Sequence, residues 1–414
     1  MTTRPALARS IGVGDAVVIG LGSMIGAGVF AAFGPAARVA GSALLLGLLV
    51  AGVIAYCNAV SSARLAALYP ESGGTYIYGQ RRLGPFWGYL AGWAFVVAKT
   101  ASCAAMALTF GTYVDSHHAR LLAVIAVATL TAVNYIGIQK SAWLTRLIVA
   151  VTLAVLLFVV LACTVGGHLS THHLSPFPGS GVRDVLQSAG LVFFAFAGYA
   201  RIATLGEEVR DPARTIPRAI TTALGITFVV YAAVALTLLL SVGAGEVAAS
   251  SSPLRAAVLA GRWHALAPAV QVGAAVAALG SLLALILGVS RTTFAMSRDG
   301  HLPRRLAAVH PRYNVPHHAE LAVGAIVTVL VLTTDLRHAI GFSSFGVLVY
   351  YAIANASAAT LTTAENRPPR WLPVLGLLGC VTVAVSLPAA SILVGAAVLA
   401  AGVLLWCGRR MLTR

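Results

Sequence analysis

The sequence predicts an all-α protein that crosses a lipid bilayer many times. Of its 414 residues, 59% are hydrophobic and 10% are charged, whereas a soluble globular domain carries about 25% charged residues. Apolar runs of about 20 residues, the length that a membrane-spanning helix needs, recur from one end of the chain to the other. So many apolar residues cannot be buried in one soluble core, so we expect no large soluble domain.

About twelve apolar runs indicate the spanning helices of a single membrane domain over residues 1–414. Their approximate ranges are 13–33, 41–66, 85–113, 121–138, 147–166, 186–207, 221–242, 267–296, 321–333, 340–361, 371–387 and 391–406. The third run opens on glycines at four-residue spacing, which is typical of a close-packing helix face. A histidine- and proline-bearing loop follows the fifth run, and a weaker segment, 246–263, is expected to be a partly re-entrant loop.

The first apolar run contains a stretch, residues 22–30, that makes a poor continuous helix. Gly22, Ser23, Gly26 and Gly28 fall within seven residues, and a glycine costs about 1 kcal/mol relative to alanine inside a helix. Non-helical backbone at membrane depth is tolerated only where it is buried in protein or lines a cavity. The stretch therefore predicts a broken helix whose free N–H groups hold an anion such as a carboxylate. The alternative is a small-residue face where two helices pack closely.

The sixth run is interrupted in a similar way. Gly198 and Arg201 stand in mid-span, and Glu207 and Glu208 follow a turn or two later. Two broken helices five spans apart fit an inverted 5+5 repeat, in which a substrate binds at the midplane between the breaks. We expect the first repeat at about 11–166, the second at about 182–361 and two extra helices at about 371–408.

The formal net charge of +16 reflects membrane topology and does not indicate nucleic-acid binding. Basic residues gather in alternate loops, for example around 81–82, 210–218 and 298–312. The positive-inside rule places these loops, and both termini, in the cytoplasm. No convincing cleavage site follows the first run, so we expect no removable signal peptide. These features indicate a multi-pass protein of the cell membrane.

Lys99 is a charged residue in the middle of the third run. It lies 14 residues from both Pro85 and Tyr113, which is roughly 20 Å along a helix and too far for its ammonium to reach the membrane surface easily. A charge at that depth costs about 2.5–3.5 kcal/mol or more and usually faces a cavity or a partner. Lys99 is therefore a candidate for function. The alternatives are a structural pairing and a lysine that burial keeps neutral.

Four motifs together resemble the amino acid–polyamine–organocation (APC) permease superfamily over nearly the whole chain. The first is the small-residue break GSMIGAGVF, and the second is the connection PESGGTY that starts at Pro70. The third, FFAFAGYARIATLGEEVRDPARTIPRAI, covers the sixth run and its exit, and the fourth is SRTTFAMSRDGHLPRRLAAVHPRYNVPHHA after the eighth run. Each motif stands at the span where the superfamily has it.

The resemblance implies a secondary transporter, either an antiporter or a symporter, that moves an amino acid or a related amine by alternating access. It implies that the backbone N–H groups of Ile25, Gly26, Ala27 and Gly28 hold the substrate α-carboxylate. It also implies that the carbonyls of Phe194, Ala195 and Ala197 take the α-amino group, which fits the preference of an ammonium for freed carbonyls. Phe196 and Tyr199 are the candidate aromatic gates. Their alternative is an ordinary place among core or lipid-facing aromatics.

The chain departs from that pattern at two positions. The lysine that proton-coupled relatives carry in the fifth span is replaced by Thr152, and the acid that often follows the sixth-span aromatic is replaced by Ala200 and Arg201. Basic groups near the expected site favour a neutral or anionic amino acid over a cationic one. Protons are the expected coupling ion if the chain is not an exchanger, and Lys99 is the candidate for carrying them.

Two roles are possible for Glu207 and Glu208. One is an inward gate, in which a glutamate pairs with a basic residue such as Arg291, and the other is a solvated charge cluster at the membrane interface. We expect no cofactor, no metal site and no enzyme activity, because the few intramembrane charges form no catalytic set. A permease for polyamines or other organic amines is the alternative within the superfamily. A channel, which usually shows rings of like charge or a repeated filter motif, and an integral membrane enzyme are the alternatives outside it.

Overall fold

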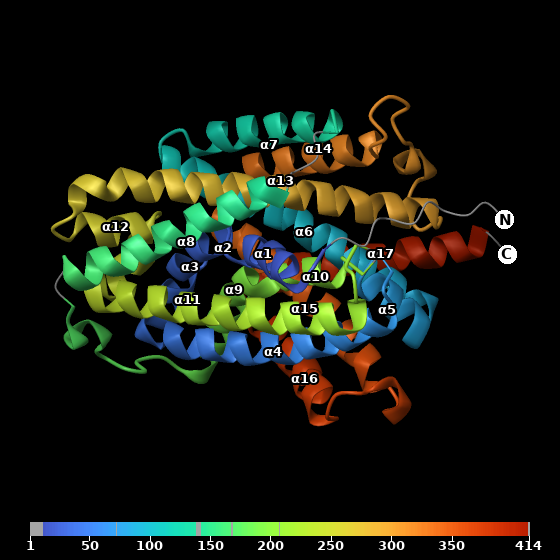
Figure 1. The fold of residues 1–414 in the computed structure, drawn as a ribbon, viewed down its shortest axis with the longest axis horizontal. Helices are drawn as coiled ribbons and strands as arrows, with labels where there is room; N and C mark the ends of the chain where they lie inside the picture. Colours follow the sequence, from blue (N-terminus) through green and yellow to red (C-terminus); the bar gives the residue numbers. More distant parts are fainter. Residues whose placement is uncertain (1–10, 72, 138–141, 167–168, 207, 413–414) are drawn as a thin grey trace.

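A computed structural model describes residues 11–71, 73–137, 142–166, 169–206 and 208–412 of the chain. In these ranges the regular structure is helical, apart from one isolated bridge between Ile11 and Val209. Most of the helices run along the long axis of one bundle (Figure 1). The α-helices, with the two short 3-10 turns η3 and η5, are α1 (Val13–Met24), α2 (Ala27–Ala31), α3 (Phe33–Ala40), α4 (Leu44–Leu68), α5 (Thr75–Arg82), α6 (Pro85–Val114), α7 (Ala119–Tyr135), α8 (Ala142–Val165), α9 (Val182–Phe196), η3 (Ala197–Tyr199), α10 (Ala200–Ala203), α11 (Pro212–Ala249), α12 (Pro253–Leu259), α13 (Ala267–Arg298), η5 (Arg304–Ala307), α14 (His317–Thr333), α15 (Leu336–Ala359), α16 (Trp371–Ser386) and α17 (Ala389–Leu412).

The helices confirm a polytopic membrane protein. Within the described ranges, nine helical segments are long and apolar enough to cross a membrane. The three shorter apolar helices α7, α14 and α16 coincide with the fourth, ninth and eleventh predicted runs. Each of the twelve predicted runs therefore corresponds to an apolar helix or an interrupted pair of helices.

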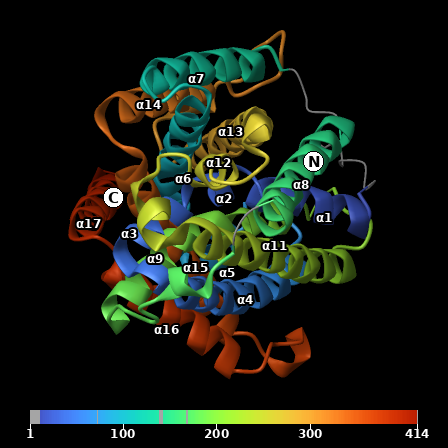
Figure 2. The same ribbon diagram turned by 90° about the vertical axis from the view of Figure 1, so that its left-hand side faces the viewer.

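Helix α2, the second half of the first interrupted span, lies near the middle of the bundle, with continuous helices such as α6, α11 and α13 around it (Figure 2). In α6 and α15, 78% of the residues in an apolar 18-residue stretch of the helix are buried inside the protein. The corresponding share is 33% in α8 and 17% in α17. The segment Val182–Ala203, which holds the second break, is 72% buried. The second break is thus shielded from lipid by protein, as non-helical backbone at membrane depth requires.

The weaker segment 246–263 is more ordered than the expected re-entrant loop. Helix α11 continues to Ala249 through a kink at Gly243, whose φ of 78° is accessible to glycine at little cost. Pro253 then starts the short helix α12, in which Leu254 and Val258 are buried. Proline fits the first turn of a helix because its missing N–H would be unpaired there anyway.

Two of the four motifs meet at the end of the bundle that carries α5. Gly74, with φ 58°, turns the chain into α5, and the hydroxyl of Tyr76 donates to Asp299 Oδ2 at 2.7 Å. The hydroxyl oxygen of Tyr76 also lies 2.9 Å from His301 Nδ1. Tyr76 belongs to the PESGGTY motif and Asp299 to the loop after α13, so one hydrogen-bond network joins motifs that are far apart in sequence.

An ion pair at the same end ties α5 to the loop after α15. Arg82 contacts Glu365 with two nitrogens, at 2.8 and 2.9 Å, and their side chains are 13% and 25% exposed. The hydrogen bond from Arg82 lowers the pKa of Glu365 to about 2. Because the folded-state pKa lies below the ordinary value of 4.5, the pair stabilises the fold above that ordinary value and loses its effect as the pH falls toward 2.

We therefore expect Arg82→Met to lower the thermal unfolding midpoint at pH 7, by an amount that shrinks as the pH falls from 4.5 toward 2. Thermal unfolding of purified protein in detergent, followed across this pH range, measures the effect. Arg81→Met is the matched control, because Arg81 and its partner Glu71 are 58% and 48% exposed and such pairs contribute little. A pH-independent difference between wild type and Arg82→Met would contradict the assignment.

Candidate functional site

The first helix is broken between Met24 and Ala27, inside the stretch that the glycine pattern singles out. Ile25 has ψ 56° and Gly26 has φ −113° and ψ −132°, so neither residue is helical. Helical geometry resumes at Ala27. Ala32 keeps φ −80° and ψ −29° between α2 and α3, so the second half of the span is almost one helix from Ala27 to Ala40.

The start of α2 has N–H groups that its own helix does not use. The first four N–H groups of a helix have no intrahelical partner, and the residue at the cap position, Gly26, has no side chain that could accept from them. In the described part of the chain, the N–H groups of Gly26, Ala27 and Gly28 donate to no backbone carbonyl outside the helices. These groups can accept an anionic ligand.

The second break exposes carbonyls. Helix α9 ends at Phe196, the tighter turn η3 follows, and α10 runs for four residues. The carbonyl oxygen of Ala197 accepts a hydrogen bond from Lys99 Nζ at 3.1 Å and another from the hydroxyl of Tyr351 at 3.2 Å. Lys99 is 7% exposed, so a buried cation from α6 lies against the backbone of this break.

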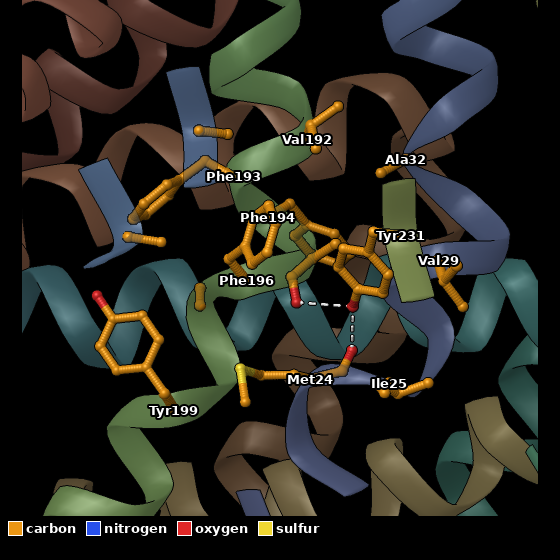
Figure 3. Packing of buried hydrophobic residues seen from close by; sticks show 14 of the residues in the cluster. Met24, Ile25, Val29, Ala32, Val192, Phe193, Phe194, Phe196, Tyr199 and Tyr231 are labelled. Atoms are coloured by element: carbon orange, nitrogen blue, oxygen red, sulfur yellow. Dashed lines mark hydrogen bonds between the residues drawn. The ribbon is translucent and has the colours of Figure 1, made fainter. Parts of the chain in front are cut away.

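The two breaks are in direct contact. A Cβ on Gly198 would overlap the carbonyl of Ser23 and lie 2.7 Å from the nitrogen of Met24, and a Cβ on Gly28 would lie 2.7 Å from the Cα of Ala195. The hydroxyl of Tyr231, on α11, lies 2.6 Å from the carbonyl oxygen of Met24 and 3.1 Å from that of Ala195, as Figure 3 shows. One tyrosine therefore bridges both breaks.

A cavity of about 170 Å³ lies beside the breaks. Ser23, Phe194, Ala197 and Gly198 line it from the breaks, Lys99 and Ser102 from α6, and Ser281 and Arg291 from α13. It extends past Arg201 and Thr204 to Gly73, Tyr76 and Glu208, at the end of the bundle where α5 lies. The volume is below the roughly 300–1,000 Å³ typical of pockets for drug-sized ligands, so the cavity suits a small solute.

Five of the sequence-predicted residues line this cavity: Lys99, Phe194, Ala197, Arg201 and Glu208. The others are buried around the breaks without lining it: Ile25, Gly26, Ala27, Gly28, Ala195, Phe196, Tyr199 and Thr152. Glu207 lies outside the described residues. In the described ranges Glu208, Arg201 and Arg291 form no ion pair.

The two expected gate aromatics lie in packed clusters. Phe196 packs against Tyr231 with ring centroids 5.1 Å apart, and Tyr199 stacks on Tyr351 at 4.9 Å. Phe194 is the aromatic of this segment that lines the cavity. Thr152, which stands where some relatives have a lysine, donates its hydroxyl to Ile148 O in its own helix at 2.7 Å.

Three residues at the site were not predicted as site residues from the sequence: Tyr231, Tyr351 and Ser281. They lie on helices far along the chain from the breaks, and the only signal is that each is a polar residue inside an apolar run. Glu320, which does not line the cavity, was also not singled out: it is fully buried in α14, and neither of its carboxylate oxygens has a hydrogen-bond partner in the described structure. An acid at the start of an apolar run is the signal that could have identified it.

A larger hollow of about 770 Å³ lies elsewhere, between α6, α14, α15 and α17. Its walls are mostly apolar side chains such as Val97, Ile326 and Val394, and it includes no residue of either break. Because a polar ligand needs convergent polar groups, the smaller cavity at the breaks is the better candidate site.

The chain is similar to known transporters over almost its full length. The sequence profile of the family described as "Amino acid permease" matches residues 15–405. An uncharacterized transporter of Mycobacterium tuberculosis is 65% identical over 408 residues, which cover 99% of this chain and 93% of that protein. The branched-chain amino acid permease of Bacillus subtilis is 25% identical over 88% of this chain and 83% of its own length. The human cationic amino acid transporter 4 is 30% identical over 89% of this chain and 62% of its own length.

The contact between the breaks leads to a prediction about Gly198. We expect Gly198→Ala to destabilise the protein by about 1–3 kcal/mol, the usual cost of overpacking, because its new Cβ would meet backbone atoms that cannot rotate away. Thermal unfolding in detergent measures the loss. Gly225→Ala in α11 is the matched control, because a Cβ there meets no atom within 4 Å. Equal midpoints for the two variants would show that the breaks are not packed as described.

Proposed function

We propose a transport function for this chain, which belongs to the amino acid permease family. We infer that it is a secondary transporter of the cell membrane that moves amino acids by alternating access. The observation that supports this best is the contact of two breaks beside a small cavity, because the first break has unused N–H groups and the second presents carbonyls. This arrangement complements the two ends of an amino acid, because N–H groups suit a carboxylate and carbonyls suit an ammonium.

The proposed site keeps the roles that the superfamily resemblance implies. Gly26, Ala27 and Gly28 hold the carboxylate, and Phe194, Ala195 and Ala197 offer their carbonyls to the rest of the substrate. Ile25 is the exception, because its N–H already donates to Leu21 O at 2.6 Å. Phe194, which lines the cavity, joins Phe196 and Tyr199 as a gate candidate. The breaks fall five spans apart, which supports two inverted repeats at about 11–166 and 182–361.

We infer that the structure is open toward the cytoplasm. Contacts bring the basic loops to one end of the bundle, since Tyr76 bonds Asp299 and Arg409 bonds Gly300 O at 2.5 Å. The positive-inside rule assigns that end, and both termini, to the cytoplasm. The cavity extends toward the same end, past Arg201, Arg291 and Glu208. These three charges are the proposed inward gate, with Glu208 pairing with Arg291 when the site closes.

The charges of the cavity favour a neutral or anionic amino acid. Lys99, Arg201 and Arg291 line it with one acid, Glu208. At an effective dielectric constant of about 20, a second positive charge roughly 7 Å from one of these cations costs about 2 kcal/mol. The same repulsion disfavours polyamines and other organic amines.

We expect exchange of alanine or glutamate to exceed that of arginine or lysine by roughly tenfold or more. Counterflow in liposomes that contain the purified protein, with each amino acid loaded in turn, measures this. A channel or an enzyme would show no accelerated exchange, so counterflow also tests the transport class. Faster exchange of arginine or lysine would contradict the proposed selectivity.

Lys99 is the proposed coupling group. Its ammonium binds a carbonyl of the break and lines the cavity, so a change in its protonation alters the site directly. We expect Lys99→Met to abolish uptake driven by a pH gradient while exchange without a gradient persists. Parallel uptake and counterflow assays in liposomes measure the two activities.

Glu320→Gln is the comparison variant for this test, because Glu320 is also a buried ionisable group but does not line the cavity. Under the proposal, this variant still responds to the gradient. If Glu320→Gln loses its response to the pH gradient and Lys99→Met keeps it, the residue that carries the coupled proton is Glu320 and not Lys99.

A further inference from the structure

Two of the three carbonyls that the superfamily resemblance assigns to a substrate ammonium, those of Ala195 and Ala197, already accept hydrogen bonds from the protein. A carbonyl oxygen has two lone pairs. At Ala197 these accept from Lys99 Nζ at 3.1 Å and from Tyr351 Oη at 3.2 Å. The neighbouring carbonyl of Ala195 accepts from the Tyr231 hydroxyl at 3.1 Å. An incoming ammonium must therefore displace a bonded group before it binds at Ala197.

Lys99 itself is a cation without a described anionic partner. Its side chain is 7% exposed and lines the cavity, and in the described parts of the chain no acidic side chain pairs with it. A buried charge is costly unless an opposite charge compensates it. The ammonium is fixed at one side of the cavity, where an anionic solute can reach it.

The other charged residues that line the cavity also favour an anionic solute. Arg201 and Arg291 add two cations to Lys99, whereas Glu208 is the single acid among the described lining residues. A substrate that brings its own ammonium adds a fourth positive charge to this small space. A substrate that carries only a carboxylate instead compensates one of the three.

We propose that Lys99 takes the place of the substrate's α-amino group, so that the site binds small organic carboxylates that lack this group. This rests on the proposed function, since it assumes that the cavity beside the breaks is the transport site. The carboxylate pairs with the Lys99 ammonium, which stays on the Ala197 carbonyl. Amino acids bind as well, but their α-amino group adds little to affinity.

The experiment compares each amino acid with its partner that lacks the amino group. Purified full-length protein in detergent is heated with alanine or propionate, with leucine or 4-methylpentanoate, and with glutamate or glutarate. A ligand that binds only the folded state raises its apparent stability by RT ln(1 + [L]/Kd). We expect at least one carboxylate without the amino group to stabilise the wild type as well as, or better than, its amino acid.

Lys99→Met tests the role of the ammonium. Removing one partner of a buried charge pair costs at least about 2 kcal/mol, so the carboxylate without the amino group should bind about thirtyfold more weakly. The amino acid should keep its affinity to within about threefold, because its ammonium can then use the freed Ala197 carbonyl. Thr100→Val is the matched control on the same helix. Thr100 is buried and bonds its own helix, but it does not line this cavity.

The outcomes separate this inference from the proposed function. If amino acids stabilise the wild type and none of their partners does, the inference is wrong and the proposed function stands. If Lys99→Met weakens both members of each pair equally, Lys99 does not replace the amino group. If no compound of either series stabilises the wild type, both proposals fail. Should Lys99→Met not fold, the wild-type comparison and Lys99→Gln decide the question.

Discussion

Backbone groups that leave a helix at membrane depth must find hydrogen-bond partners within the protein, and two such places meet in this bundle. Ile25 and Gly26 interrupt the first span and η3 interrupts the sixth. The carbonyls of Met24, Ala195 and Ala197, at the edges of these breaks, accept hydrogen bonds from side chains of three other helices. These side chains are Tyr231 on α11, Lys99 on α6 and Tyr351 on α15. Several of the surrounding helices are therefore positioned by hydrogen bonds to the backbone of the two breaks.

Direct contact between the breaks explains the residue types found there. Gly198 faces the backbone of Ser23 and Met24, and Gly28 faces Ala195. A side chain at either glycine would separate the two interrupted spans and remove the hydroxyl bridge of Tyr231. The glycines that weaken the helices are thus the residues that allow the helices to meet.

Both breaks could be predicted from the sequence because glycines and a charge inside an apolar run are local signals. The four motifs are also contiguous strings, so they identified the family. The hydrogen-bond partners could not be predicted in this way, because Tyr231 and Tyr351 depend on contacts across 207 and 154 residues. Gate roles for Phe196 and Tyr199 were inferred from position alone, whereas the direction of each ring depends on packing against Tyr231 and Tyr351. Similarly, the depth of Lys99 predicted a partner, but only the fold shows that the partner is a backbone carbonyl.

The bridge between Ile11 and Val209 joins the interrupted helices at a second place. Ile11 donates to Glu208 O and accepts from Arg210 N, both at 3.1 Å. The entry to α1 and the exit from α10 are therefore fastened together, while the breaks are fastened by Tyr231. Two helical spans that are joined at two separate points resist sliding and rotation against one another. The first and sixth spans are therefore expected to move together, as one unit, in any rearrangement of the bundle.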